Sequence, residues 1–426
     1  MGQAPRPLVP ARSVLDYVGA QLRQLRIARG MSQADLAPLV FVHRDLVRKI
    51  EVAERIPSPE FLQGCDEVLQ TGGALARLSP LVERERLLRS ARASDVDAAT
   101  FRGSALDRPV LDWLLAVPTS GQRADSDADG GGEGAAGAAA DLRKLRAMDH
   151  FRGAGAIYPT LTRSLSGRLQ DLTVTAPHIA TGMLELAGYE AIDLGVDGVA
   201  QGHYLRALQL MTQSGNTLYG GYLVAVSLAH LALHCGDPDQ AARLAAAGLH
   251  GTQGQATPAV RAAFRAVLAR AHARRHDEAA CTATLLQADA DLARSRAGEE
   301  PDWIRYFGGA DLADEKAHCF FDLGRYELAY QETQTALDLL PPGRARRISI
   351  DTALQAATLA RKQDVERACM VARQAIDHTT GMTSFRAAHR IVLMLAELHP
   401  YAHTADVRDV VDYAHTRLPP VIPSSG

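Results

Sequence analysis

The chain has 426 residues, and its 46 basic and 49 acidic side chains give a formal net charge of −3 at pH 7. This near balance argues against a protein that binds polyanions over its whole surface, and 47% hydrophobic residues exclude a disordered chain. The length suggests two or three domains. Only 5% of the residues are aromatic and alanine recurs in runs, for example at residues 245–247, so the composition predicts an all-α protein.

The cysteines and the apolar segments indicate the cellular setting. The five cysteines lie far apart without a CxxC pair, which is typical of a reducing compartment. The first residues lack the apolar stretch of a signal peptide, and the most apolar segment, residues 222–233, is too short to cross a bilayer. We therefore expect a cytoplasmic protein that does not associate with membranes.

The first predicted domain is a compact run of short helices over residues 14–79, after a proline-rich tail at residues 1–13. Gly30 ends one predicted helix, and Ser32 is a suitable N-cap for the next, with Asp35 three residues later. Proline residues then separate this helical run from a further helix, which ends before two consecutive glycines. The pattern predicts a small helical domain.

Two segments of different composition follow this domain. Residues 80–118 continue the helical pattern and are predicted to be connecting helices. Residues 119–140 contain no aromatic or branched aliphatic side chain, so they cannot bury enough apolar surface to offset the entropy lost on ordering. We predict a flexible linker there, with independently moving domains on its two sides.

Residues 141–418 are almost continuously helical in pattern, and residues 419–426 form a short tail. A small residue recurs at the same point of each predicted second helix, with spacings of 41, 38, 50 and 39 residues: Ala200, Ala241, Ala279, Ala329 and Ala368. Repeats of this length are typical of stacked helix pairs. The longest interval contains an insertion with three aromatic residues, at residues 298–309.

One of these repeats resembles a tetratricopeptide repeat. The stretch is residues 323–341, and the matching positions are Gly324, Tyr326, Ala329, Ala336 and Pro341. The neighbouring repeats are less regular, and their period is longer than the typical ~34 residues. The resemblance implies a helical solenoid.

Residues 22–58 resemble the helix-turn-helix domain of phage-repressor-like (Xre-type) regulators. The matching positions are Leu22, Arg26, Gly30, Ser32, Gln33, Leu36, Ala37, Val42, Val47, Ile50, Glu51, Pro57 and Ser58. The resemblance implies that the second central helix enters the major groove of DNA. It also implies that Arg26 and Glu51 form a buried ion pair, which would leave an unpaired charge if one partner were removed.

The resemblance assigns roles to five residues. Gln33 would hold a backbone phosphate, while Arg44, Asp45 and Lys49 would face the bases with Arg48 nearby. Arginine and lysine donate to guanine, and aspartate accepts from the cytosine amine. The alternative is a degenerate helical domain that binds only proteins.

Two positions depart from the family pattern. Phe41 stands where the turn usually has glycine, and a left-handed backbone there costs a bulky residue about 1 kcal/mol or more. His43 replaces the usual serine or threonine cap of the second helix and is expected to be a poorer cap.

The charge of the domain bears on how it binds DNA. Residues 14–58 contain seven basic and five acidic side chains, a net charge of +2. Because phosphate neutralisation supplies most non-specific affinity, one copy should bind weakly. We therefore expect a homodimer on an inverted-repeat operator of double-stranded DNA, with no indication of where the two copies meet.

A wider resemblance covers residues 187–211, 220–245 and 299–325. These segments are similar to actinobacterial regulators that join an Xre-type domain to a tetratricopeptide-like body, many of which act in specialised metabolism or development. The resemblance implies an effector or partner, of unknown peptide, small-molecule or protein nature, bound by the repeats. The candidate surface consists of aromatic residues, whose alternative role is packing between helices: Tyr204, Tyr219, Tyr222, Trp303, Tyr306 and Phe307.

Patterns typical of enzymes and cofactor sites carry little weight in this chain. The G-x-G-x-x-G match at residues 132–137 follows no predicted strand and lies in a glycine- and alanine-rich tract, so chance explains it better than a dinucleotide. Histidines spaced four apart lack the glutamate of a zinc-binding H-E-x-x-H motif. We expect no catalytic residues, no metal and no cofactor, and we predict a transcription regulator, with a protein-interaction scaffold carrying a vestigial head as the alternative.

Overall fold

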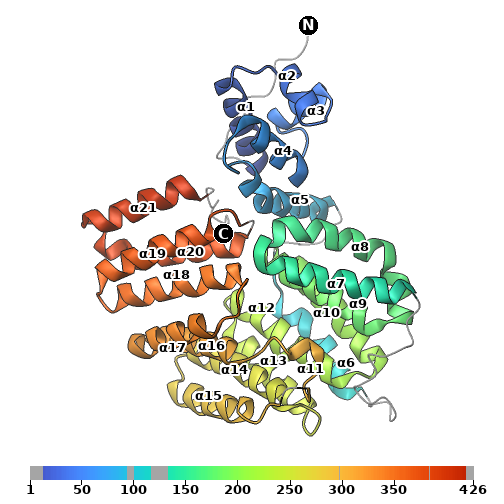
Figure 1. Cartoon of the computed structure of the whole chain (residues 1–426). Helices are drawn as coiled ribbons and strands as arrows, with labels where there is room; N and C mark the ends of the chain where they lie inside the picture. The colour runs from blue at the N-terminus through green and yellow to red at the C-terminus, as the bar shows by residue number, and fades with distance from the viewer. Residues whose placement is uncertain (1–12, 94–99, 117–132, 297, 383, 419–426) are drawn as a thin grey trace.

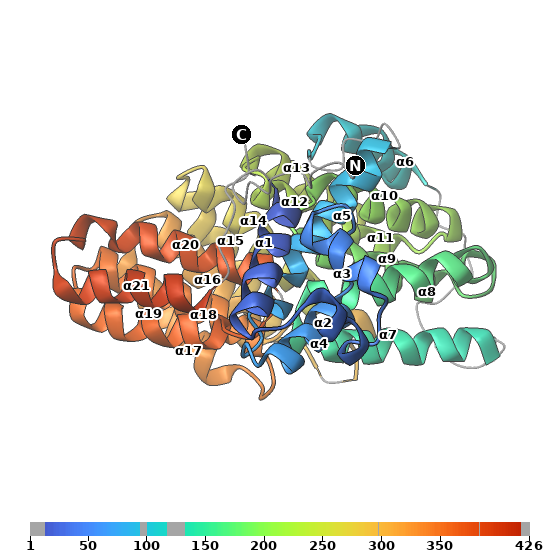
Figure 2. The same cartoon turned by 90° about the horizontal axis from the view of Figure 1, so that it is seen from above.

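The computed structural model describes residues 13–93, 100–116, 133–296, 298–382 and 384–418. Within these ranges the regular structure is helical and contains no strand, which confirms the predicted all-α class. A small head, formed by the N-terminal helices, sits on a large curved body (Figure 1). Seen from above, the head lies over the middle of the body (Figure 2).

The head consists of four helices and a short 3-10 turn: α1 (Val14–Ala28), α2 (Gln33–Leu39), α3 (Arg44–Glu51), α4 (Pro59–Leu69) and η1 (Ala76–Leu78). Ser32 caps α2 in a capping box with Asp35, as the sequence predicts. The backbones of α1 and α3 touch, since a β-carbon at Gly19 would lie 2.7 Å from the carbonyl oxygen of Ile50. This contact fixes the end of α3 against the core of the head.

The segment predicted to connect the domains is divided between them. Helix α5 (Ser79–Ala93) belongs to the head, whose core includes its first turn, and it packs against α8 (Ala154–Thr175) of the body. By contrast, η2 (Gly103–Leu106) and α6 (Asp107–Leu115) belong to the body. The indole of Trp113 on α6 is 1% exposed, and its Nε1 donates to the carbonyl oxygen of Thr217 at 3.2 Å. A β-carbon at Gly220 would lie 2.5 Å from the indole nitrogen, so the body is shaped around this side chain.

The first part of the predicted linker at residues 119–140 lies outside the described residues, which resume at residue 133. Helix α7 (Glu133–Arg152) begins within it, so the prediction of a flexible linker is wrong for residues 133–140. Ala135 and Ala138 are buried on the face that continues with Leu142 and Leu145. Alanine suits a helix that packs closely on its neighbours, and this periodicity outweighs the low hydrophobicity of the stretch.

The body continues through stacked antiparallel helices. In chain order these are α8, α9 (Pro177–Asp193), α10 (Asp197–Ser214), α11 (Thr217–Tyr222), the π-helical η3 (Leu223–Leu228), α12 (Ala229–His234), α13 (Pro238–Gly251), α14 (Pro258–Arg274), α15 (Glu278–Leu292), η4 (Asp302–Ile304), α16 (Gly309–Asp322), α17 (Tyr326–Leu339), α18 (Ala345–Arg361), α19 (Val365–Thr379), α20 (Phe385–Leu398), η5 (His399–Tyr401) and α21 (Ala405–Arg417).

The predicted repeats correspond to helix pairs, and the recurring small residue is the fourth residue of each second helix. Ala200, Ala241, Ala329 and Ala368 occupy this position and are fully buried. In α15 the fourth residue is Cys281, also fully buried, whereas Ala279 is exposed. The alignment on Ala279 is therefore wrong by two residues, because a buried cysteine fills the same small space as alanine.

The two ends of the curved body meet. Helix α18 contacts α7, and α20 contacts α9. At this junction the guanidinium of Arg346 donates to both carboxylate oxygens of Asp149 at 2.5 Å and lies 3.5 Å from a carboxylate oxygen of Asp193. The hydroxyl of Ser384 donates to the second oxygen of Asp193 at 2.6 Å. These buried charges join helices that are distant in the sequence, so they hold the curved body closed.

The head contacts the body at this same junction. The Arg84 guanidinium on α5 donates to the carbonyl oxygen of Gly195 at 3.3 Å and lies 5.5 Å from the ring centre of Phe385. Phe385 also packs against the hydrophobic core of the head. The head and the body are thus in direct contact, in contrast to the independent domains expected from the sequence.

Candidate nucleic-acid interface

Helix α3 presents the predicted DNA-reading side chains on the outer side of the head. Arg44 is exposed, and the side chains of Arg48 and Lys49 are 43% and 44% exposed. In the described part of the chain Arg44 takes part in no ion pair. The structure therefore brings Arg44, Asp45, Arg48 and Lys49 together on one helix with its polar face in solvent.

Asp45 neutralises part of this surface. Its carboxylate lies 2.7 Å from the Lys49 ammonium and 3.2 Å from Nε of Arg48. The hydrogen bond from Lys49, opposed by slight desolvation and supported by Arg48, lowers the pKa of Asp45. At neutral pH the carboxylate is charged, so it holds two cations in place and reduces the attraction of the helix for phosphates.

Gln33 lies at the first position of α2, as the phosphate-binding role requires, but its side chain also faces inward. Its amide nitrogen donates to the Glu51 carboxylate at 2.7 Å. The second N–H of the amide remains available for a phosphate oxygen. The hydrogen bond to Glu51 thus sets the direction of the Gln33 side chain.

The ion pair implied by the resemblance is present beneath these residues. Nε and Nη2 of Arg26 donate to the two carboxylate oxygens of Glu51 at 2.5 and 2.9 Å, and Nη1 donates to the carbonyl oxygen of Met31 at 2.6 Å. Arg26 and Glu51 are 7% and 2% exposed. The pair connects α1 to the end of α3, so it fixes the orientation of α3.

The two departures from the family pattern have different outcomes. Phe41 adopts the left-handed backbone conformation, with φ of 56°, and its side chain is 95% exposed, so the turn keeps its shape despite the bulky residue. His43 does cap α3, because its Nδ1 accepts a hydrogen bond from the backbone N–H of Asp45 at 3.2 Å. An imidazole nitrogen thus replaces the hydroxyl of the usual cap.

The predicted effector surface is mostly interior. Tyr204, Tyr219, Tyr222 and Phe307 are buried, so the prediction of an exposed aromatic surface is wrong for these four residues. Trp303 stacks on Tyr219 with ring centres 5.0 Å apart, and the hydroxyls of Tyr222 and Tyr306 are 3.0 Å apart. These contacts fasten the insertion to α11, which is the packing role given above as the alternative. Tyr306 remains 43% exposed.

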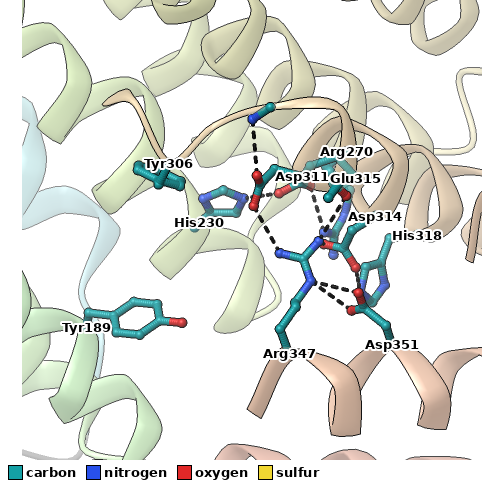
Figure 3. A network of polar contacts seen from close by, with 12 residues as sticks. Tyr189, His230, Arg270, Tyr306, Asp311, Asp314, Glu315, His318, Arg347 and Asp351 are labelled. Atoms are coloured by element: carbon teal, nitrogen blue, oxygen red, sulfur yellow. Dashed lines mark hydrogen bonds and ion pairs between the residues drawn. The ribbon is translucent and has the colours of Figure 1, made fainter. Parts of the chain in front are cut away.

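A polar network beside Tyr306 connects the inner helices of the body (Figure 3). Arg347 on α18 contacts Asp351 at 2.9 Å and, on α16, Asp314 at 3.1 Å. Glu315 lies 2.9 Å from Arg270 and 3.0 Å from His230. Although burial alone would raise the pKa of Glu315, Arg270 and His230 hold it below its usual range. The inner side of the body is therefore rich in charge, which the aromatic pattern of the sequence does not reveal.

Comparison with known proteins supports the interpretation of the head. Residues 18–78 match the helix-turn-helix domain family, a stretch that runs from α1 to η1. This match supports a DNA-binding regulator. No curated protein matches the chain. Among the described helices, none is both long and apolar enough to cross a membrane.

Proposed function

We propose that the protein is a sequence-specific transcription regulator that reads DNA with α3. The observation that carries this proposal is the exposed set of Arg44, Arg48 and Lys49 on the second helix of a helix-turn-helix domain. Side chains on this helix reach base edges in the major groove, and arginine and lysine donate to guanine. The domain match together with this set favours a regulator over an enzyme.

Asp45 and Gln33 complete the proposed interface. Asp45 accepts a hydrogen bond from the cytosine amine or, where a phosphate approaches instead, repels it. Gln33 donates its free amide hydrogen to the DNA backbone and so fixes the register. Both residues are held by neighbours in the head, which pre-organises the surface for one geometry of the duplex.

The regulator works as a homodimer on an inverted repeat. The net charge of +2 over residues 14–58 supplies few phosphate contacts per copy, and Asp45 reduces their number further. Two heads about one helical turn apart double the contact area and match the two-fold symmetry of the operator.

The repeat body senses an effector or a partner and transmits its state to the head. This proposal follows the resemblance to actinobacterial regulators of specialised metabolism or development with tetratricopeptide-like bodies. It is supported by the contact of Arg84 with Phe385 and Gly195, since both ends of the curved body meet the head there. A change in curvature of the body would move the head relative to a second copy.

Selection of bound sequences from random duplex DNA tests the reading role. We expect a short inverted repeat, with affinity that falls steeply as salt rises. The double variant Arg44→Ala, Lys49→Ala should weaken operator binding about 100-fold, since each good base contact contributes about 1–3 kcal/mol. Arg143→Ala with Lys144→Ala is the matched control. Both residues are exposed on α7, so this pair of substitutions removes the same two positive charges away from α3.

Two results would contradict the proposal. Recovery of the same motif at unchanged affinity by the Arg44, Lys49 variant would remove α3 from the interface. Failure of the wild-type chain to enrich any motif would favour the alternative, a protein-interaction scaffold with a vestigial head. The pairing of Asp45 with both Arg48 and Lys49 is the observation that keeps this alternative in view.

A further inference from the structure

Three arginines lie near one another on the inner side of the body. They are Arg386 and Arg390 on α20 and Arg270 on α14, and the charges of Arg270 and Arg386 both act on Arg390. Arg270 is paired with Glu315 at 2.9 Å, and Arg386 donates to the Tyr189 hydroxyl at 2.5 Å. Arg390 is half-buried and has no ion pair within the described residues.

The environment of Arg390 disfavours its charge. Burial, Arg270 and Arg386 lower the pKa of its guanidinium to about 10, and Asp314 and Asp322 offset this only in part. At neutral pH the side chain is still charged. An uncompensated charge close to other cations is costly, and an anion is the partner that would relieve the cost.

The neighbouring histidines add no further positive charge to this cluster. Burial and the nearby Arg386 and Arg390 lower the pKa of His234 to about 4, so it is neutral at physiological pH. His389 on α20 is held below its usual pKa by burial and by Arg390. Neutral imidazoles donate hydrogen bonds without adding repulsion, which suits them to the rim of an anion site.

Unsatisfied donors point to the same place. The Nε atoms of Arg270 and Arg386 are buried and have no hydrogen-bond partner in the described part of the chain, and Nε of Arg386 lies 3.8 Å from a carboxylate oxygen of Asp193. Buried donors are normally satisfied, so these two nitrogens retain the capacity to donate to a further acceptor.

Helix α20 also offers an apolar contact next to these cations. Arg386, His389, Arg390 and Leu393 are spaced i, i+3, i+4 and i+7, so they share one face of the helix. Leu393 is 45% exposed. A ligand that spans this face would place an anionic group on the arginines and an apolar group on the leucine.

We propose that this face of α20, together with Arg270 and His234, binds a small organic anion that carries a carboxylate or phosphate group. Guanidinium groups bind both of these groups with two parallel hydrogen bonds. The inference deepens the sensing role given to the body and rests on that proposed function for its biological meaning. Because Phe385 begins the same helix and contacts Arg84 of the head, the site lies one residue from the contact between the two regions.

Thermal unfolding of the full chain tests the site without DNA. The probes are inorganic phosphate and hexanoate, each compared with chloride at the same ionic strength. We expect at least one probe to raise Tm by about 2 °C or more through preferential binding to the folded state. A response to phosphate alone or to hexanoate alone identifies which anionic group the site accepts.

Substitution at Arg390 separates a ligand site from a structural role. In chloride, Arg390→Gln should unfold at the same or a higher temperature, because it relieves repulsion from Arg270 and Arg386, and it should lose the response to the probe. Arg390→Lys should retain part of the response. Arg274→Gln, an exposed arginine on α14, is the matched control and should respond like the wild type.

Three results would overturn the site: no response of the wild type to either probe, an equal response in Arg390→Gln, or a fall in Tm of Arg390→Gln in chloride. The first would show that the chain binds neither group, the second would place the binding away from Arg390, and the third would assign Arg390 to the fold. DNA selection remains interpretable in each case, so failure of the anion site is distinguishable from failure of the DNA-reading proposal.

Discussion

The head and the body both carry clustered arginines, but the charge of these arginines is compensated differently in the two regions. On α3, Asp45 lies beside Arg48 and Lys49, and the side chains of all three are nearly half exposed. On α20, Arg390 is half-buried, lacks an ion pair in the described chain and lies near Arg270 and Arg386. Water screens the first arrangement, so it suits the highly charged surface of DNA. The charge of the half-buried Arg390 is screened less by water, so it suits a small anionic ligand that binds at one site.

The largest expected effect concerns the buried charge of the head. Arg26 is paired with the Glu51 carboxylate, whereas Arg390 has no ion pair in the described chain. Arg26→Ala would leave the Glu51 carboxylate buried without its cation. We expect the free energy of unfolding of the head to fall by about 3–5 kcal/mol, the usual cost of breaking a buried pair. Urea denaturation of the full chain, followed by a probe placed in the head, measures this loss.

Arg29→Ala is the control for this measurement. Arg29 lies one turn from Arg26 on the same side of the chain, but its hydrogen bonds to Gln70 are exposed. A surface change of this kind should alter stability by less than about 0.5 kcal/mol. If both variants lost the same free energy of unfolding, the burial of the Arg26–Glu51 pair would not contribute to the stability of the head.

The difference between the two regions also explains what could be predicted. Arg44, Asp45, Arg48 and Lys49 follow one another on a single helix, so their common face follows from local periodicity and from the family resemblance. The capping box of Ser32 and the helix pairs of the body are equally local. Arg270 and Arg390 are 120 residues apart, and only the closure of the curved body brings them together.

The errors have the same origin. Ala279 and Cys281 are two residues apart, and only the start of α15 at Glu278 decides which of them is the buried fourth residue. The aromatic residues of the insertion do make contacts, but with other residues of the body: Trp303 stacks on Tyr219, and Tyr306 contacts Tyr222. Whether such a cluster faces solvent or a neighbouring helix depends on packing that lies outside the segment.

The contact between the regions offers a second test, with an effect of intermediate size. Phe385→Ala removes the ring that packs on the head and faces Arg84. In the wild type, we expect the probe that raises Tm to change operator affinity at least about fivefold, within the usual range of coupling between sites. In the variant the change should fall below about twofold, with operator affinity in chloride unaltered. Fluorescence anisotropy with labelled operator measures both.

Val392→Ala is the matched control for Phe385→Ala, because Val392 lies on the same helix and is 42% exposed. In Val392→Ala, the probe should change operator affinity as much as it does in the wild type. A full response in Phe385→Ala as well would show that the two regions communicate through another contact, and the direct α5–α8 packing would then be the next candidate.

The smallest expected effect concerns the compensation of charge on α3 itself. Asp45→Asn would free Arg48 and Lys49 and remove a negative charge from the proposed DNA-binding surface. An exposed ion pair contributes at most about 1 kcal/mol, so stability should hardly change. Affinity for random duplex DNA should rise a few-fold and depend more steeply on salt, while affinity for the selected operator should rise less, since phosphate attraction acts on every sequence. Anisotropy titrations on both duplexes over a range of salt concentrations measure the ratio of the two affinities.

If the affinities for random and selected DNA rise equally, Asp45 acts only as a neutralising charge and reads no base. If operator affinity falls instead, Asp45 reads a base directly, and the aspartate then both restrains the cations of α3 and selects the sequence that they bind.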